Sequence, residues 1–338
     1  MSLKRLCIVS SYPLSLMRGG LDIQAERSLE ELSLHDTTYK YEFFDWRTKH
    51  AADLYHFFGI PPYLWEIAEC VRAAQKPYIV HLLSGQRQTF FNSWARDRIK
   101  RTLGMRSNSK VLENAAKVAM ITESERDLLC RAFSIPREKT VVIPHLVDDV
   151  FFTASSDVWH RERGDSPFLL CVGWIQKRKN QLLLARAANA AKLPLVLIGP
   201  PLPTEKAYAA EVGELMKENK KYGGAWIMGL SQTDPLLISA HRACRAFVLL
   251  SEAETQPLSV LQAMAAKRPV LLGKSFYTNS EPFSSLPQVN LDSFEEIREA
   301  LLKIWENGPI FPLSEQHRTK YIVSELLKLY RSVLVPSP

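Results

Sequence analysis

The chain has 338 residues, 46% of them hydrophobic, and a formal net charge of +7. This length suits two domains of ordinary size, and the modest positive charge fits an anionic partner such as a nucleotide, an acidic lipid surface or nucleic acid. Five scattered cysteines, none of them in a C-x-x-C pair, argue against a zinc site and against a disulfide framework.

The N-terminal segment has too short an apolar core for a signal peptide. No uninterrupted apolar run approaches the roughly 18 residues that span a bilayer. We therefore expect a cytoplasmic protein, either free in solution or peripheral to the inner face of the membrane.

The first part of the chain predicts a Rossmann-like domain over residues 1–152, because short apolar runs alternate there with helical patterns. Gly19 and Gly20 follow the first strand, and a pair of glycines lets the backbone approach a ligand closely, although a tight turn without a ligand is the commoner explanation. His81 ends a buried strand, where a satisfied core histidine is the alternative to a ligand contact. Strands are expected at 6–10, 41–45, 54–58, 78–81 and 118–122, and helices at 21–32 and 64–74.

A basic stretch follows at residues 86–110, with seven Lys or Arg residues, several aromatic residues and Asp97 as its one acidic residue. A basic helix that begins with aromatic residues can lie on anionic lipid. A solvated basic helix whose aromatic residues enter the domain core explains the pattern equally well. The stretch matches no recognisable nucleic-acid module, so a nucleic-acid partner is disfavoured.

A second Rossmann-like domain is predicted over 153–313, after a polar linker at 152–167. Its first strand ends at Gly173, and the basic run Lys177 to Lys179 then stands at the start of a helix. Three cations there oppose the helix dipole, which makes sense if an anion binds, although a solvated charge run is the ordinary alternative. Further strands are expected at 195–199, 225–230, 246–250 and 270–272, and helices at 208–217, 235–243 and 314–333.

The stretch 246–269 predicts a strand, a polar loop, a helix and the start of another strand. Pro257 suits the first helical position, which leaves the N–H groups of Leu258 and Ser259 at the carboxyl edge of a parallel sheet, where phosphate can bind. Glu254 and Gln262 are spaced to point into one crevice. An ordinary strand–helix–strand unit with a solvated Glu and Gln is the alternative.

This stretch resembles the paired-glutamate signature of family 4 glycosyltransferases, which are retaining enzymes of the GT-B fold. Ser251, Glu254 and Pro269 match the pattern, whereas Gln262 replaces the second glutamate and Lys267 or Arg268 replaces a glycine.

The resemblance extends in order and spacing over residues 6–333. It includes a glycine loop at 19–22, a V-I-P-x-x-V-D segment at 142–148 and a V-G-x-x-x-x-x-K-N segment at 172–180. Trp174 stands where the last of these usually has arginine.

The resemblance implies the GT-B fold, in which two Rossmann-like domains face each other across a cleft. The first domain would bind the acceptor, the second would bind the nucleotide-sugar donor, and a C-terminal helix at 314–338 would cross back to the first. The implied activity is metal-independent, retaining transfer of a hexose-type sugar from a UDP- or GDP-sugar to a glycan or lipid-linked acceptor in polysaccharide or cell-envelope biosynthesis. No cofactor and no metal ion is implied beyond the donor substrate.

The resemblance also assigns roles to individual residues. Glu254, His81 and Lys179 are the expected catalytic residues, with Lys179 on the diphosphate and the other two on the donor sugar. The expected donor-binding residues are Gly19, Gly20, Arg178, Leu230, Thr255, Leu258, Ser259 and Gln262.

Two other functions stay open. Trp174 and Gln262 depart from the family pattern and fit a catalytically weakened homologue that acts as a binding or partner subunit. A sugar-nucleotide epimerase of the same fold is the third candidate, and it is disfavoured because the basic stretch would then have no purpose.

Overall fold

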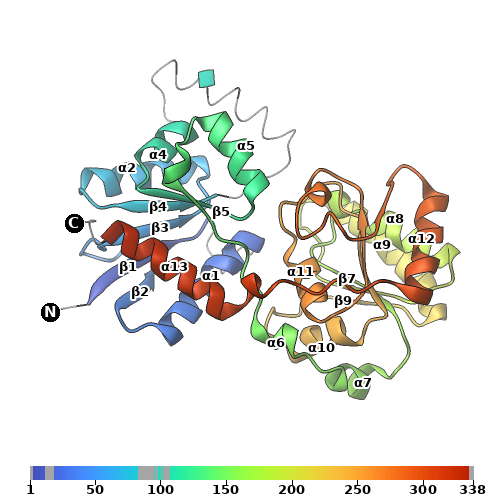
Figure 1. Cartoon of the computed structure of the whole chain (residues 1–338). Helices are drawn as coiled ribbons and strands as arrows, with labels where there is room; N and C mark the ends of the chain where they lie inside the picture. The colour runs from blue at the N-terminus through green and yellow to red at the C-terminus, as the bar shows by residue number, and fades with distance from the viewer. Residues whose placement is uncertain are drawn as a thin grey trace. The chain divides into compact units, whose positions relative to one another are not determined.

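The structure of the chain is a computed structural model, and it describes residues 3–11, 19–82 and 107–334 together with 95, 98, 99 and 102. The chain divides into two compact units (Figure 1). Unit 1 comprises residues 1–146 and 315–338, and unit 2 comprises residues 147–314.

Unit 1 is built on a parallel six-stranded sheet with the strand order β2-β1-β3-β4-β5-β6. The strands are β1 (Lys4–Val9), β2 (Tyr39–Phe43), β3 (Leu54–Phe58), β4 (Tyr78–His81), β5 (Lys117–Met120) and β6 (Thr140–Val142). The described helices are α1 (Gly20–His35), α2 (Trp65–Ala73), α4 (Asn108–Asn114), α5 (Glu123–Phe133) and α13 (Thr319–Leu334), with short 3-10 turns η1 (Pro62–Leu64), η2 (Arg137–Lys139) and η6 (Glu315–His317).

Both faces of this sheet are buried, so its central strands are apolar at nearly every position. In β3, Leu54 and Phe58 belong to one apolar cluster and Phe57 to the other, as the alternation of a strand requires. The C-terminal helix α13 contacts α1 and contributes Leu326 and Tyr330 to the first of these clusters (Figure 1). The last helix is therefore part of the core of unit 1.

Unit 2 is built on a second parallel six-stranded sheet, with the order β12-β11-β10-β7-β8-β9. The strands are β7 (Leu169–Val172), β8 (Leu195–Ile198), β9 (Ala225–Ile227), β10 (Ala246–Leu249), β11 (Val270–Gly273) and β12 (Gln288–Val289). The helices are α6 (Asp149–Phe152), α7 (Asp157–Arg163), α8 (Gln181–Ala190), α9 (Lys206–Asn219), α10 (Pro235–Ala243), α11 (Leu258–Ala265) and α12 (Phe294–Asn307), with 3-10 turns η3 (Lys177–Lys179), η4 (Lys220–Tyr222) and η5 (Tyr277–Asn279).

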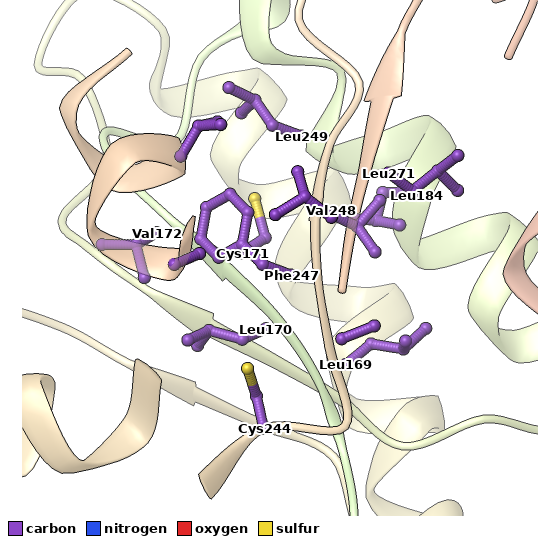
Figure 2. Close-up of a cluster of buried hydrophobic side chains, with 14 of the residues drawn as sticks. Leu169, Leu170, Cys171, Val172, Leu184, Cys244, Phe247, Val248, Leu249 and Leu271 are labelled. Carbon is purple, nitrogen blue, oxygen red and sulfur yellow. The ribbon is translucent and has the colours of Figure 1, made fainter. Parts of the chain in front are cut away.

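The strands β7 and β10 lie side by side at the centre of this sheet, and their side chains form its core (Figure 2). From β7 the chain adds β8 and β9 on one side, then returns to β10 and adds β11 and β12 on the other side. The strand order therefore reverses between β7 and β10. Ligands of open parallel sheets bind outside the carboxyl ends of the strands at such a reversal.

The polar linker predicted at 152–167 is wrong, because these residues contain α7 and join the core of unit 2. Trp159 is buried and stacks on Phe168 with 4.5 Å between ring centroids. Its backbone N–H donates to Ser239 Oγ at 2.9 Å. One buried tryptophan thus holds a segment that is otherwise polar in composition.

The helix predicted at 314–333 begins later, at Thr319, because η6 precedes it. Among the described residues, no helix is both long enough and apolar enough to cross a membrane.

Candidate functional site

The site of interest lies at the strand reversal of unit 2, where two loops leave the carboxyl ends of β7 and β10. The first loop contains η3, with Arg178 and Lys179. The second loop contains Ser251 and Glu254 and leads into α11. Because β7 and β10 are neighbours in the sheet, the two loops meet.

The Glu254 carboxylate is the centre of this contact. Its Oε1 atom accepts hydrogen bonds from Lys179 Nζ at 2.7 Å and Ser251 Oγ at 3.0 Å, and lies 2.9 Å from Arg178 Nη1. Its Oε2 atom has no hydrogen-bond partner among the residues that the structure describes. The side chains of Glu254 and Lys179 are only 12% and 10% exposed. Three donors therefore surround one carboxylate oxygen, whereas the other oxygen meets no described residue.

The charges in this cluster determine the protonation of Glu254. Burial opposes the charged carboxylate, but Lys179 and Arg178 together outweigh burial and hold the pKa of Glu254 below its ordinary value. The carboxylate is therefore ionised at neutral pH. Because the Glu254 side chain is only 12% exposed, it is not the solvated Glu of the alternative.

Backbone contacts between the two loops hold the cluster in place. The Arg178 carbonyl accepts from Glu252 N at 2.9 Å and from Ser251 Oγ at 3.1 Å. Asn180 has a left-handed φ of 54° and donates through Nδ2 to the Leu250 carbonyl at 3.1 Å. Asparagine is one of the few residue types that adopt this conformation readily, so its place between η3 and α8 has a physical reason.

Two glycines let the strand ends approach each other. Gly173 and Gly199 follow β7 and β8 with φ of +141° and +144°, a region that L side chains rarely adopt. A Cβ at Gly199 would lie 2.2 Å from the Gly173 carbonyl oxygen, and a Cβ at Gly173 would lie 3.2 Å from Lys179 Cε. The loop that carries Lys179 therefore packs directly over Gly173.

The helix α11 begins beside this cluster. Pro257 was expected at the first helical position, but it is the N-cap, with φ −65° and ψ 112°, and its carbonyl accepts from Val260 N and Leu261 N. The first helical residues are Leu258 and Ser259, whose N–H groups precede the first bond within the helix. These two amides, which the sequence placed at a phosphate-binding edge, do lie at the start of the helix that follows Glu254.

Gln262 is buried in α11 and has a partner that the sequence did not indicate. Its Nε2 donates to Gln232 Oε1 at 2.9 Å. Gln232 lies in the loop between β9 and α10, which also carries the partly buried Leu230. Thr255 is partly buried in the loop before α11. The predicted donor residues of the second domain thus all lie in loops or a helix start at one edge of the sheet.

The remaining predicted site residues belong to unit 1. His81 ends β4, is buried, and stacks on Phe58 and on His56 with 5.0 and 5.7 Å between ring centroids. Burial lowers the pKa of His81 to about 4, and the Ile143 carbonyl opposes this shift. Neither ring nitrogen reaches hydrogen-bond geometry with a described residue. His81 is therefore neutral at neutral pH.

The glycine pair stands at the start of α1. Gly19 is the N-cap and donates its N–H to Asp22 Oδ2 at 3.1 Å, and Gly20 is the first helical residue. A Cβ added at Gly20 would meet no atom within 4 Å. The described part of the fold therefore does not itself require glycine at this position.

The basic stretch 86–110 lies outside the described residues except at 95, 98, 99, 102 and 107–110, so its predicted membrane contact stays a prediction.

One comparison, with a family model, concerns unit 2. Residues 156–309, nearly all of unit 2, match the model for glycosyl transferases group 1. This part of the chain is a group 1 glycosyltransferase domain. No curated protein matches the sequence significantly.

Solved structures add the fold of this glycosyltransferase. Sucrose-phosphate synthase from Thermosynechococcus elongatus is similar with a TM-score of 0.72 and 16% identity, over 99% of this chain and 100% of that one. HepE from Anabaena, in complex with UDP and glucose, is similar with a TM-score of 0.69 and 14% identity, over 98% and 100%. WaaG, a glycosyltransferase involved in lipopolysaccharide biosynthesis, is similar with a TM-score of 0.61 and 13% identity, over 99% and 100%.

The predicted family, the predicted GT-B fold and the predicted glycosyltransferase class are therefore confirmed. Three features of this edge of the sheet had no signal in the sequence: the contact of Arg178 with Glu254, the partner of Gln262, and the position of Tyr277.

Proposed function

We propose that this glycosyltransferase moves a sugar, with retention of anomeric configuration, from a UDP- or GDP-sugar to a glycan or lipid-linked acceptor of the cell envelope. One observation supports a nucleotide-diphosphate sugar as the donor. Arg178 and Lys179 converge with Glu254 at the strand reversal of unit 2, beside the start of α11. Two cations and a helix N-terminus at one edge of the sheet suit a diphosphate.

A diphosphate leaving group fits this arrangement because negative charge builds on its outer phosphate as the glycosidic bond breaks. Lys179, Arg178 and the first amides of α11 would stabilise that charge from positions that are fixed before the reaction begins. Glu254 Oε2, which accepts no hydrogen bond from a described residue, would accept from a hydroxyl of the donor sugar. The acceptor would attack from the leaving-group side, with the departing phosphate taking its proton.

The ribose of the nucleotide would contact Gln262. Because Gln262 Nε2 is engaged by Gln232, its Oε1 is the atom oriented to accept from a ribose hydroxyl. A neutral amide makes a weaker bond than the glutamate of the family pattern. The loop of Leu230 would meet the base, and Thr255 would line the donor site beside Glu254.

The residues of unit 1 would serve the sugar and the acceptor. A neutral His81 with unengaged ring nitrogens can donate to, or accept from, a sugar hydroxyl. Gly20 offers open backbone for close approach. Peripheral attachment to an anionic membrane and metal independence remain proposals that rest on the sequence.

A catalytically weakened homologue is the second candidate function. Trp174 in place of arginine and Gln262 in place of glutamate favour it, since both changes remove charge from the donor site. The retained Lys179–Glu254 contact favours the enzyme instead. The two candidates differ in one measurable respect, because a weakened homologue binds the nucleotide sugar without turning it over.

The test begins with a thermal-shift screen of UDP- and GDP-sugars, followed by assays of donor hydrolysis and sugar transfer. We expect Lys179→Ala to lower turnover by about a hundredfold, as loss of one preorganised charge contact does. The matched control is Lys177→Ala, which removes a neighbouring but exposed lysine of the same basic run and should leave turnover unchanged. Near-native turnover in Lys179→Ala would refute the phosphate role, and donor binding without turnover in the wild type would favour the second candidate.

A further inference from the structure

A buried tyrosine lies next to the site and has no role in the function proposed above. Tyr277 is in η5, in the loop that leaves the carboxyl end of β11. It is 4% exposed, and its hydroxyl has no hydrogen-bond partner among the described residues. The Ser275 hydroxyl in the same loop is likewise buried without a partner. Burying a hydroxyl without a hydrogen-bond partner destabilises the fold, so its presence calls for a physical reason.

The position of this loop brings Tyr277 close to Glu254. The strand β11 pairs with β10, so the loop of Tyr277 neighbours the loop of Glu254 at the same edge of the sheet. The ring is held by Phe283, with 5.6 Å between centroids and an edge-on angle of 75°. Burial raises the pKa of Tyr277, and so does the charge of Glu254, whereas Arg178 opposes them. The hydroxyl is therefore a neutral donor within electrostatic reach of Glu254 and Arg178.

Binding of the nucleotide sugar would take the charged partners away from Glu254. Lys179 and Arg178 contact Glu254 Oε1 in this structure, and the same two cations are the ones proposed to bind the diphosphate. If they turn to the phosphates, the buried carboxylate loses charged partners. A buried carboxylate without partners is strongly unfavourable, so another donor is needed to keep it ionised.

We propose that Tyr277 is a positioning residue whose hydroxyl donates to the Glu254 carboxylate once a nucleotide diphosphate engages Arg178 and Lys179. This inference rests on the proposed function, because it assumes that a diphosphate binds there. The exchange leaves Glu254 charged and oriented toward the donor sugar. Without the tyrosine hydroxyl, the Glu254 carboxylate would lose its partners when the diphosphate binds, or would take up a proton from solvent.

The experiment removes only the hydroxyl. Tyr277→Phe keeps the ring against Phe283, and calorimetry then measures UDP and GDP binding. We expect the dissociation constant to rise about tenfold, as for loss of one hydrogen bond to a charged group. The melting temperature of the unliganded protein should stay the same or rise, since no bond is lost in the free state. The control is Tyr222→Phe, which removes a hydroxyl at the opposite end of the sheet, just before β9, and should change neither quantity.

Two further readouts separate positioning from a merely structural role. The Tyr277→Phe protein should take up more protons on binding UDP than the wild type, because Glu254 is protonated instead of re-paired; titrations in buffers of different ionisation enthalpy measure this. In a Glu254→Gln background there is no charge to hold, so Tyr277→Phe should no longer weaken binding.

The proposal is overturned if Tyr277→Phe binds UDP and GDP like the wild type, as expected if an ordered water satisfies the hydroxyl in both states. It is also overturned if the weakening persists unchanged in the Glu254→Gln background. If Lys179→Ala weakens binding and Tyr277→Phe does not, this inference fails and the proposed function stands. If Lys179→Ala has no effect, the proposed function itself fails.

Discussion

At the scale of single residues, the site depends on how one carboxylate distributes its hydrogen bonds. Glu254 Oε1 meets two cations and a hydroxyl, whereas Oε2 meets no described residue. The proposed function therefore gives the carboxylate two separate tasks: one oxygen would neutralise Arg178 and Lys179 until a diphosphate binds, and the other would accept from the donor sugar. Removing the charge should separate these two tasks.

We expect Glu254→Gln to keep or strengthen UDP and GDP binding while it lowers sugar transfer at least a hundredfold. The amide no longer neutralises Lys179 and Arg178, so both cations attract the diphosphate more strongly, but it contacts the sugar poorly. The unliganded protein should lose about 1–3 kcal/mol of stability, which UDP restores by binding the folded state. Calorimetry, transfer assays and thermal melts measure the three effects.

The matched control is Glu252→Gln, because Glu252 is exposed and its side chain accepts, among the described residues, only from Asn180 Nδ2, at 3.3 Å. It should change none of the three quantities. Weaker diphosphate binding in Glu254→Gln would contradict the assignment of the two cations to the phosphates.

The sequence could predict the site residues that lie within one motif, and not their partners in other loops. Glu254, Leu258 and Gln262 lie on one strand–loop–helix unit, where spacing alone sets their order. The contact of Arg178 with Glu254 joins residues far apart in the chain, and so does the bond between Gln262 and Gln232. Such contacts follow from strand order, which the pattern of one sequence does not determine.

At the scale of elements, the strands and helices were the most predictable features, since continuous apolar runs mark buried parallel strands. The strand expected at 54–58 has these bounds in the structure, and so does the helix at 235–243. The predicted linker failed because α7 is polar except for Val158 and Trp159, and Trp159 is its one buried residue. A single buried side chain gives no periodicity that the sequence could reveal.

Close packing at the ends of β7 and β8 leaves no room for a side chain at Gly199. Gly199→Ala should destabilise unit 2 by about 2–4 kcal/mol, because the new Cβ meets the Gly173 carbonyl oxygen in a conformation that alanine rarely adopts. Urea unfolding followed by tryptophan fluorescence measures the loss. An unchanged unfolding midpoint would show that the two strand ends do not approach as described.

Gly20→Ala provides the comparison, since a Cβ there meets no atom within 4 Å and alanine favours a helix. Its stability should be unchanged or slightly higher, while donor turnover falls if a ligand approaches this backbone. Full turnover in Gly20→Ala would remove Gly20 from the proposed donor set.

At the scale of the whole molecule, buried neutral histidines should make the protein sensitive to acid. Burial lowers the pKa of His81 and of His241 to about 4 and lowers the pKa of His56 and of His317 as well. For His81 and His241, the unfolded chain takes up a proton near the ordinary histidine pKa of 6.5, and the folded chain only near a pKa of 4. Each neutral histidine therefore makes its full contribution to the free energy of unfolding above pH 6.5. This contribution is lost as the pH falls toward 4, by up to about 3 kcal/mol for each of His81 and His241.

Urea unfolding at a series of pH values between 7 and 4 measures this loss. His241→Leu should reduce its slope, because a leucine beside Phe151 and Phe247 keeps an apolar contact without titrating. The same pH dependence in wild type and His241→Leu would show that the burial of His241 is not responsible.

The central claim is that the Lys179–Arg178–Glu254 cluster of unit 2 binds a diphosphate, and one comparison of affinities tests it most directly. Calorimetry of UDP against UMP, and of GDP against GMP, isolates the contribution of the second phosphate. We expect either UDP or GDP to bind at least tenfold more tightly than the corresponding monophosphate. This difference in affinity should be lost in Lys179→Ala and kept in Lys177→Ala. Equal affinities for diphosphate and monophosphate in the wild type, or an advantage that survives Lys179→Ala, would contradict the claim.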